Sequence, residues 1–191
     1  MKKAATAMAL ASVMAAPFAM VGNSFAAGGH QQRGARSAAD TTSTKTELEA
    51  EMRFRATDIK AEAEVEWEQG LRNGVLRTKF SGEVEILLLN PATPPVAAGI
   101  DAGITLTGGS CTFLGDPVVM GPVVVGTQTF YRVAFRGSVA QSGANPIVVR
   151  GLDCGGVIPA VALGDSASVN VTGLPAGTTT PILTGTFALD D

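Results

Sequence analysis

The sequence predicts an all-β protein, folded as an antiparallel β-sandwich or a jelly-roll-like barrel. Residues 47–85 alternate between apolar and polar side chains, which is the period of strands with one buried face. Short apolar runs then follow along the rest of the chain, separated at nearly every junction by glycine or proline. Strands of this length and spacing are typical of sandwiches and small barrels. The content of 46% hydrophobic residues in 191 supports one core, so we place a single domain at residues 47–191.

The first 26 residues are typical of a cleaved secretory signal peptide. Lys2 and Lys3 precede a long apolar run, and residues 24–26 (SFA) put small side chains at the positions that signal peptidase reads. An uncleaved membrane anchor is the alternative, which Pro17 disfavours. No later run is long and apolar enough to cross a bilayer as a helix, so we expect a protein that does not span the membrane after cleavage. The expected location is secreted or periplasmic.

Residues 27–46 (AGGHQQRGARSAADTTSTKT) are expected to form a disordered leader, because they are small, polar and without period. They contain His30, the one histidine of the chain. A histidine in such a leader is not positioned to act as the base of a Ser-His-Asp or Cys-His site. Histidine-based zinc and copper sites are disfavoured for the same reason.

Two stretches of alternation follow, with one phase slip at Thr57-Asp58. A helix is the alternative, because alanine and glutamate are good helix formers. A helix would expose Phe54 and Val65, whereas alternation places every apolar residue on one face, with Trp67 in the core. We therefore expect strands on both sides of the slip, and a bulge or a tight corner at the slip itself.

Residues 69–74 (QGLRNG) supply turn chemistry before the alternation resumes. A two-residue turn at Asn73-Gly74 would place Glu64 opposite Glu83. A longer loop would instead place Glu64 opposite Lys79. Because like charges on facing strands oppose pairing, we predict the longer loop.

The chain beyond this hairpin contains a loop at residues 90–99 with three prolines, followed by short strands. Residues 166–172 (SASVNVT) alternate most cleanly, and Tyr131 shares a face with Val133. The expected strands are 103–107, 111–114, 122–125, 127–135, 146–154, 157–163, 166–172 and 181–189.

Cys111 and Cys154 are the two cysteines of the chain. In an exported protein a single pair usually forms a disulfide, although two free buried thiols are the alternative. A metal site on this pair is disfavoured, since no histidine lies nearby to complete it. We predict a Cys111–Cys154 bridge, which would stabilise the fold by roughly 4 kcal/mol in the chain-entropy model.

Glutamate occupies every second position from Glu62 to Glu68, which could form a cation-binding or glycosidase face. A glycosidase needs two carboxylates that face one another across a cleft. A row on one strand favours an ordinary solvated face.

Four aspartates lie beside glycines in expected loops: Asp101, Asp116, Asp153 and Asp165. Loop carboxylates can bind calcium, but these lack the Asp-x-Asp-x-Asp spacing of a dedicated loop. Aspartates that form turns are the favoured interpretation. The sequence thus indicates no catalytic, cofactor-binding or metal-binding residue.

The order of signal peptide, polar leader and Gly/Thr/Val-rich β-domain with one cysteine pair resembles exported bacterial β-sandwich proteins. Pilus subunits of the chaperone-assisted type share that outline. This chain ends in Asp190-Asp191, where such subunits usually carry an aromatic residue, and its cysteines fall late rather than early. The resemblance therefore transfers no functional residue.

We expect an exported, non-enzymatic protein with a structural or protein-interaction role at the bacterial cell surface or in the periplasm. Its partner would be another surface protein or a glycan. Nucleic acid is disfavoured, since the formal net charge is −3 and no basic face is indicated. Two alternatives stay open: a small-ligand or glycan-binding module assisted by calcium, and a hydrolase that uses a pair of carboxylates.

Overall fold

The computed structural model describes residues 45–145 and 147–190. The expected signal peptide, His30 and nearly all of the expected leader lie outside the described residues. The first strand begins at Lys45, two residues before the expected start of the domain at residue 47.

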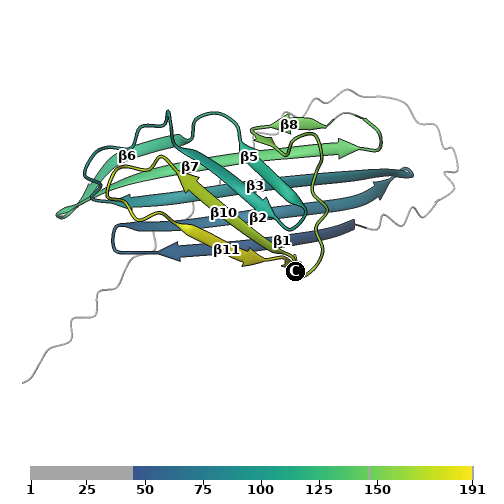
Figure 1. The fold of residues 1–191 in the computed structure, drawn as a ribbon, viewed down its shortest axis with the longest axis horizontal. Coiled ribbons are helices and arrows are strands. Elements are labelled where there is room, and N and C mark those ends of the chain that lie inside the picture. The colour runs from purple at the N-terminus through teal and green to yellow at the C-terminus, as the bar shows by residue number, and fades with distance from the viewer. Residues whose placement is uncertain (1–44, 146, 191) are drawn as a thin grey trace, which may run out of the picture. The chain divides into compact units, whose positions relative to one another are not determined.

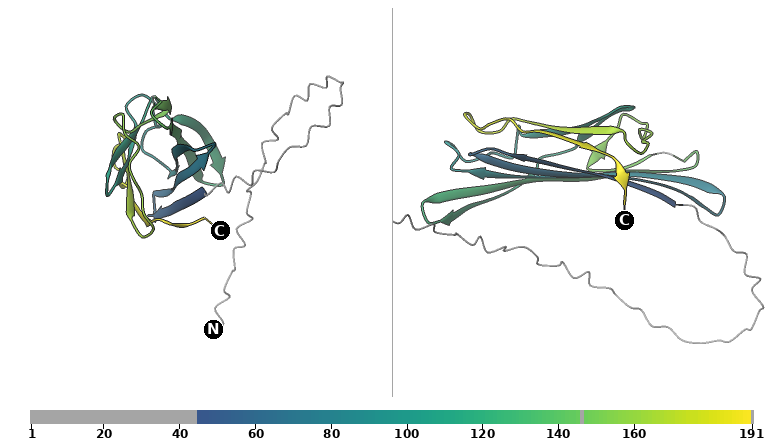
Figure 2. Two further views of the ribbon diagram at one scale, coloured as in Figure 1. Left: turned by 90° about the vertical axis from the view of Figure 1, so that its right-hand side faces the viewer. Right: turned by 90° about the horizontal axis from the view of Figure 1, so that it is seen from below.

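Two antiparallel sheets pack face to face, which confirms the predicted β-sandwich (Figure 1). The large sheet has seven strands in the order β12-β1-β2-β3-β7-β6, with β8 added beside β7. The small sheet has five strands in the order β11-β10-β4-β5-β9, and the end view in Figure 2 shows the two layers. The strands are β1 (Lys45–Arg55), β2 (Ile59–Arg72), β3 (Val75–Leu89), β4 (Asp101–Leu106), β5 (Gly109–Phe113), β6 (Val118–Val125), β7 (Gln128–Ser142), β8 (Val148–Arg150), β9 (Leu152–Asp153), β10 (Ser166–Thr172), β11 (Ile182–Thr186) and β12 (Ala188–Leu189).

The core lies between the sheets and takes alternate side chains from the long strands, as the alternation predicts, whereas β6, β8 and β12 contribute no fully buried side chain. Trp67 is buried as expected, and its indole N–H donates a hydrogen bond to the carbonyl of Pro159 at 3.2 Å. The rings of Phe113 and Phe135 join the two sheets, with centroids 5.6 Å apart. Because burial on one side alone imposes a period of two, the charged residues of β1 to β3 all fall on the outer face of the large sheet.

The phase slip at Thr57-Asp58 is a tight corner where the chain reverses, the second of the two predicted alternatives, and not a bulge within one strand. Arg55 at the end of β1 faces Lys60 at the start of β2, and the strands pair in antiparallel register along their length. The side chain of Asp58 accepts hydrogen bonds from the backbone N–H and the hydroxyl of Thr179, at 2.6 and 2.8 Å. These bonds lower the pKa of Asp58 and fasten the turn to the loop before β11.

The prediction of a longer loop between β2 and β3 is wrong. The structure has the two-residue turn at Asn73-Gly74 instead, with Arg72 paired to Val75. Both turn residues have positive φ, 53° and 74°, as this kind of hairpin turn requires. Glu64 consequently faces Glu83. The prediction weighed the charges of two strands and missed the third, since Arg136 of β7 forms an ion pair with Glu83.

Arg132 of β7 pairs with Glu85 in the same way. The cations that offset the glutamates of β3 thus come from a strand about 50 residues further along the chain, which the local pattern does not identify.

The later strands agree with the sequence in part. Strand β10 has the predicted bounds, and β11 and β12 fall within the predicted 181–189. Strand β7 extends past the predicted end at Phe135 to Ser142. The strand predicted at 157–163 is absent, and this segment is a loop that buries Ile158 and Val161 against the core. Pro159 within this segment has no N–H to donate to a neighbouring strand.

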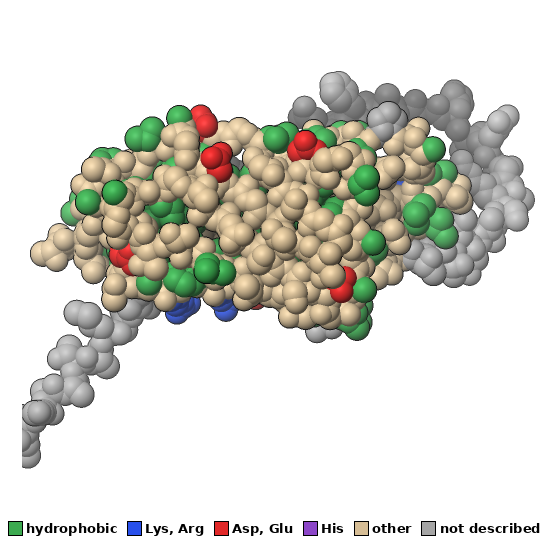
Figure 3. Space-filling view, in the orientation of Figure 1, with side chains coloured by type: hydrophobic (Ala, Val, Ile, Leu, Met, Phe, Trp, Pro, Cys, Tyr) green, Lys and Arg blue, Asp and Glu red, His purple; other side chains and the backbone are tan. Residues whose placement is uncertain are grey.

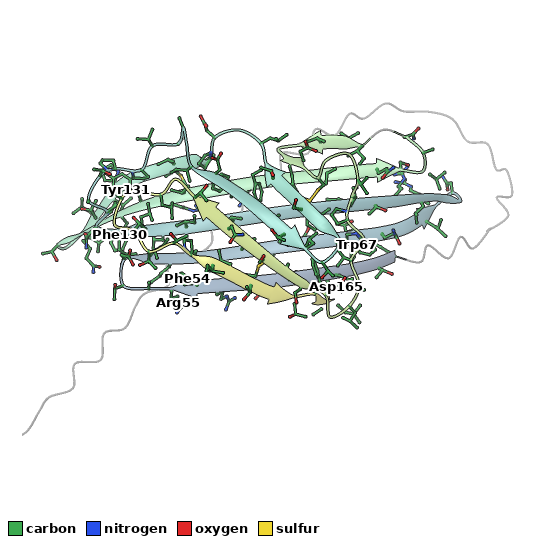
Figure 4. The ribbon with its side chains drawn as sticks, in the orientation of Figure 1. Phe54, Arg55, Trp67, Phe130, Tyr131 and Asp165 are labelled. Carbon is green, nitrogen blue, oxygen red and sulfur yellow. A yellow bond between two sulfur atoms is a disulfide. The ribbon has the colours of Figure 1, made fainter. Side chains whose placement is uncertain are left out.

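The Cys111–Cys154 disulfide is present, as predicted (Figure 4). It joins β5 to the residue that follows β9, and these two strands are neighbours in the small sheet. Between the two cysteines the chain crosses to the large sheet, forms β6, β7 and β8, and returns. The bridge therefore closes a loop that contains parts of both layers.

Candidate functional site

The outer face of the large sheet, turned away from the small sheet, carries most of the charge of the domain. Figure 3 views the opposite side and shows few charged side chains there. The register places one row across four strands: Glu51, Glu64, Glu83 and Arg136. The predicted glutamate row is thus on a sheet face, among the side chains of neighbouring strands.

Two glutamates in the middle of this face have raised pKa values, because they are partly buried and lie beside other carboxylates. The pKa of Glu64 is raised mainly by partial burial, and to a smaller extent by the charges of Glu49 and Glu66. Partial burial, followed by the charge of Asp190, raises the pKa of Glu49. A hollow of about 360 Å³ lies beside them, lined by Glu64, Glu66, Ser81, Gly82, Glu83, Arg136, Gly137, Ser138 and Arg150.

These carboxylates are neighbours on one face and do not oppose one another across a cleft. Glu64 and Glu83 are directly paired on adjacent strands of the same sheet. In residues 45–145 and 147–190, no three His, Cys, Asp or Glu side chains are grouped so as to hold a metal ion. The hydrolase alternative stays a prediction.

Cations balance the glutamates near the start of β1. Lys79 lies 2.9 Å and Lys45 lies 3.5 Å from carboxylate oxygens of Glu68. Burial acts to raise the pKa of Glu68, but the hydrogen bond and charge of Lys79, with the charge of Lys45, outweigh it and hold the pKa below its usual value.

Two of the four loop aspartates act as turn formers. Asp153 accepts a hydrogen bond from the backbone N–H of Gly155 at 2.9 Å, and Asp165 accepts one from that of Ala162 at 2.8 Å. Asp101 begins β4, and Asp116 lies in the loop between β5 and β6. The calcium-assisted alternative stays a prediction.

A larger hollow lies at the far end of the β2–β3 hairpin, and we call it the hairpin-end hollow. It has a volume of about 610 Å³. Its lining comprises Lys45, Glu68, Gln69, Gly70, Leu71, Arg72, Arg77, Thr78, Lys79, Ala140, Gln141, Ser142, Asn145 and Val148. The lining therefore combines small and apolar side chains with several cations.

The third candidate is β6, the strand at one edge of the large sheet, which we call the β6 edge. Its sequence, VVMGPVVV, contains no charged residue. Val118 and Val124 are 60% and 66% exposed, and Met120, Val123 and Val125 are exposed as well. The pairing with β7 shifts register between Met120 and Val123.

Sequence reasoning missed both the hairpin-end hollow and the β6 edge. The run of apolar residues at 118–125 does not alternate, which was the available signal that both faces of this strand share one environment. Periodicity alone cannot tell a strand that is buried on both faces from one that is exposed on both. The hollow depends on β7 and β8, which lie far from the hairpin in sequence.

Comparison with protein families, with curated proteins and with solved structures finds no match to this chain. Within the part of the chain that the structure describes, no helix has the length and apolar character needed to span a membrane.

Proposed function

We propose that the protein is an exported, non-enzymatic β-sandwich with a protein-interaction role at the cell surface or in the periplasm. The β6 edge is the observation that carries this proposal. It presents five exposed apolar side chains on the last strand of a sheet, with no charge among them. Natural proteins usually protect such an edge with lysine or another charge, because it is prone to association. An uncovered apolar edge is therefore best explained as an interface.

The expected occupant is an apolar, uncharged surface of a different protein. Two copies of β6 would not form a continuous ladder, because the strand has a register shift and Pro122 has no backbone N–H. The valine side chains on both faces of the strand remain available for packing.

Export is supported by two independent features. The first 26 residues have the pattern of a signal peptide. The Cys111–Cys154 bridge is the kind of bond that persists in oxidising compartments outside the cytoplasm.

A photo-crosslinking residue at position 124, in the full chain expressed in its own host, tests the interface. Val157 is the matched control position, since it is 69% exposed in a loop away from β6. We expect a discrete adduct with another exported protein from position 124 and none from position 157, and the adduct should be lost when Val123→Lys is added. Equal adducts from both positions, an adduct only with a second copy, or none from position 124 would contradict the proposal.

A further inference from the structure

The β2–β3 hairpin continues beyond the sandwich core. Trp67 and Phe80 form its last buried pair, and Leu71 and Leu76, which face one another further along, are exposed. The backbone N–H of Gly143, in the turn after β7, donates to the carbonyl of Leu76 at 2.7 Å and holds this end in place. The hairpin-end hollow is thus built on hydrogen-bonded strands. Its volume of about 610 Å³ falls in the usual range of small-ligand sites, about 300–1,000 Å³.

Small side chains on neighbouring strands account for the depth of the hollow. The register places Gly70, Ser142 and Ala140 on the outer face, where larger residues would fill the space. Val148 of β8 pairs with Ala140 and adds an apolar wall. The aliphatic stem of Arg77 can extend this apolar surface while its charged end stays in water. The hollow is therefore suited to an alkyl chain.

The cations of the hollow differ in whether they have a partner. Lys45 and Lys79 both form ion pairs with Glu68. The side chains of Arg72 and Arg77 have no ion pair or hydrogen bond with any other described residue. Gly70 of β2 directly faces Arg77 of β3, and Arg72 lies two residues after Gly70 on the same face. Arg72 and Arg77 are therefore diagonal neighbours, whose backbones are typically about 7–8 Å apart. Two unpaired guanidinium groups at this spacing can share one carboxylate.

We propose that the hairpin-end hollow binds a free fatty acid of about twelve carbons, with the carboxylate at Arg72 and Arg77 and the alkyl chain over Ala140 and Val148. An anionic bilayer also presents negatively charged groups next to alkyl chains, but it would have to approach the whole outer face. The glutamates around Glu64 and Glu83 would repel it. A single soluble amphiphile that occupies the hollow avoids that repulsion. This inference does not depend on the β6 edge.

Calorimetric titration of the purified full chain with laurate, below its critical micelle concentration, tests the proposal. We expect saturable binding of one laurate per chain. The double substitution Arg72→Gln with Arg77→Gln should weaken it at least about tenfold, since charge-assisted bonds to the carboxylate are lost. Ala140→Leu, which fills the hollow without changing charge, should weaken it as well. Arg55→Gln is the matched control, because Arg55 is an exposed arginine on the same face at the opposite end of the strands (Figure 4).

Further measurements test whether the ligand must be negatively charged, and whether it is a free fatty acid or a lipid bilayer. Dodecylammonium has the same chain and the opposite charge, and it should not bind. Thermal unfolding of each variant checks that it is folded, and if the double variant fails this check the single substitution Arg77→Gln takes its place. The proposal is overturned if laurate does not bind, if Arg55→Gln weakens binding as much as the double substitution, or if dodecylammonium binds equally well. Binding to phosphatidylglycerol vesicles without binding to laurate would also overturn it.

Discussion

Glu64 shows how a single residue can oppose the fold that contains it. Glu51 and Glu83 flank it on the neighbouring strands, and partial burial with the charges of Glu49 and Glu66 raises its pKa. A raised carboxyl pKa means that the folded state binds the proton more readily than the unfolded chain does. The ionised group therefore lowers stability as the pH rises through and above its ordinary value of 4.5.

We expect Glu64→Gln to raise the free energy of unfolding at pH 7 by up to about 1 kcal/mol, the usual scale of cross-strand pairs. The gain should shrink at acid pH, where the wild-type carboxyl is protonated. Urea denaturation at both pH values measures it. Glu62→Gln is the control and should gain less, because Glu62 has Arg53 on one neighbouring strand and Glu85 on the other, whereas Glu64 lies between two glutamates. A loss of stability for Glu64→Gln at pH 7 would show that the acidic row is stabilising.

At the scale of the element, the β2–β3 turn sets the register of the whole hairpin. Gly74 has a φ of 74°, and a Cβ at this position would meet no atom within 4 Å. The cost of Gly74→Ala is therefore conformational, about 1–2 kcal/mol for a non-glycine residue in the left-handed region. We expect that loss in the free energy of unfolding from urea denaturation, while Asn73→Gly stays nearly neutral. A neutral Gly74→Ala would instead indicate the longer loop.

The elements also show which features the sequence can predict. Alternation identified the buried face of β1 to β3, since one-sided burial imposes a period of two on any strand. It did not yield the register of β2 against β3, because the charges that offset Glu83 and Glu85 come from Arg136 and Arg132 of a distant strand, and without them the tight turn looked unfavourable. Residues 157–163 are apolar like a strand, yet they cover the core as a loop that supplies a carbonyl to Trp67.

The candidate sites were harder to predict than the fold. The glutamate row was visible in the sequence, but the hairpin-end hollow exists only where β2, β3, β7 and β8 meet. The β6 edge has an apolar run like a core strand, and only its position at the end of the sheet leaves it exposed. Strand order is a property of the tertiary structure, which local periodicity does not contain.

At the scale of the whole molecule, the disulfide couples the two sheets through chain connectivity. The segment between Cys111 and Cys154 builds the β6–β7–β8 side of the large sheet, so in the unfolded chain the bridge restricts strands of both layers. A loop of this length predicts a loss of roughly 4 kcal/mol in the chain-entropy model when the bridge is removed. We expect the double substitution Cys111→Ala with Cys154→Ala to lower the urea midpoint by the corresponding amount. Adding a thiol reducing agent should lower the urea midpoint of the wild type and leave the urea midpoint of the double variant unchanged. If reduction left the wild-type midpoint unchanged while mass mapping confirmed the bridge, the coupling of the sheets through this loop would be refuted.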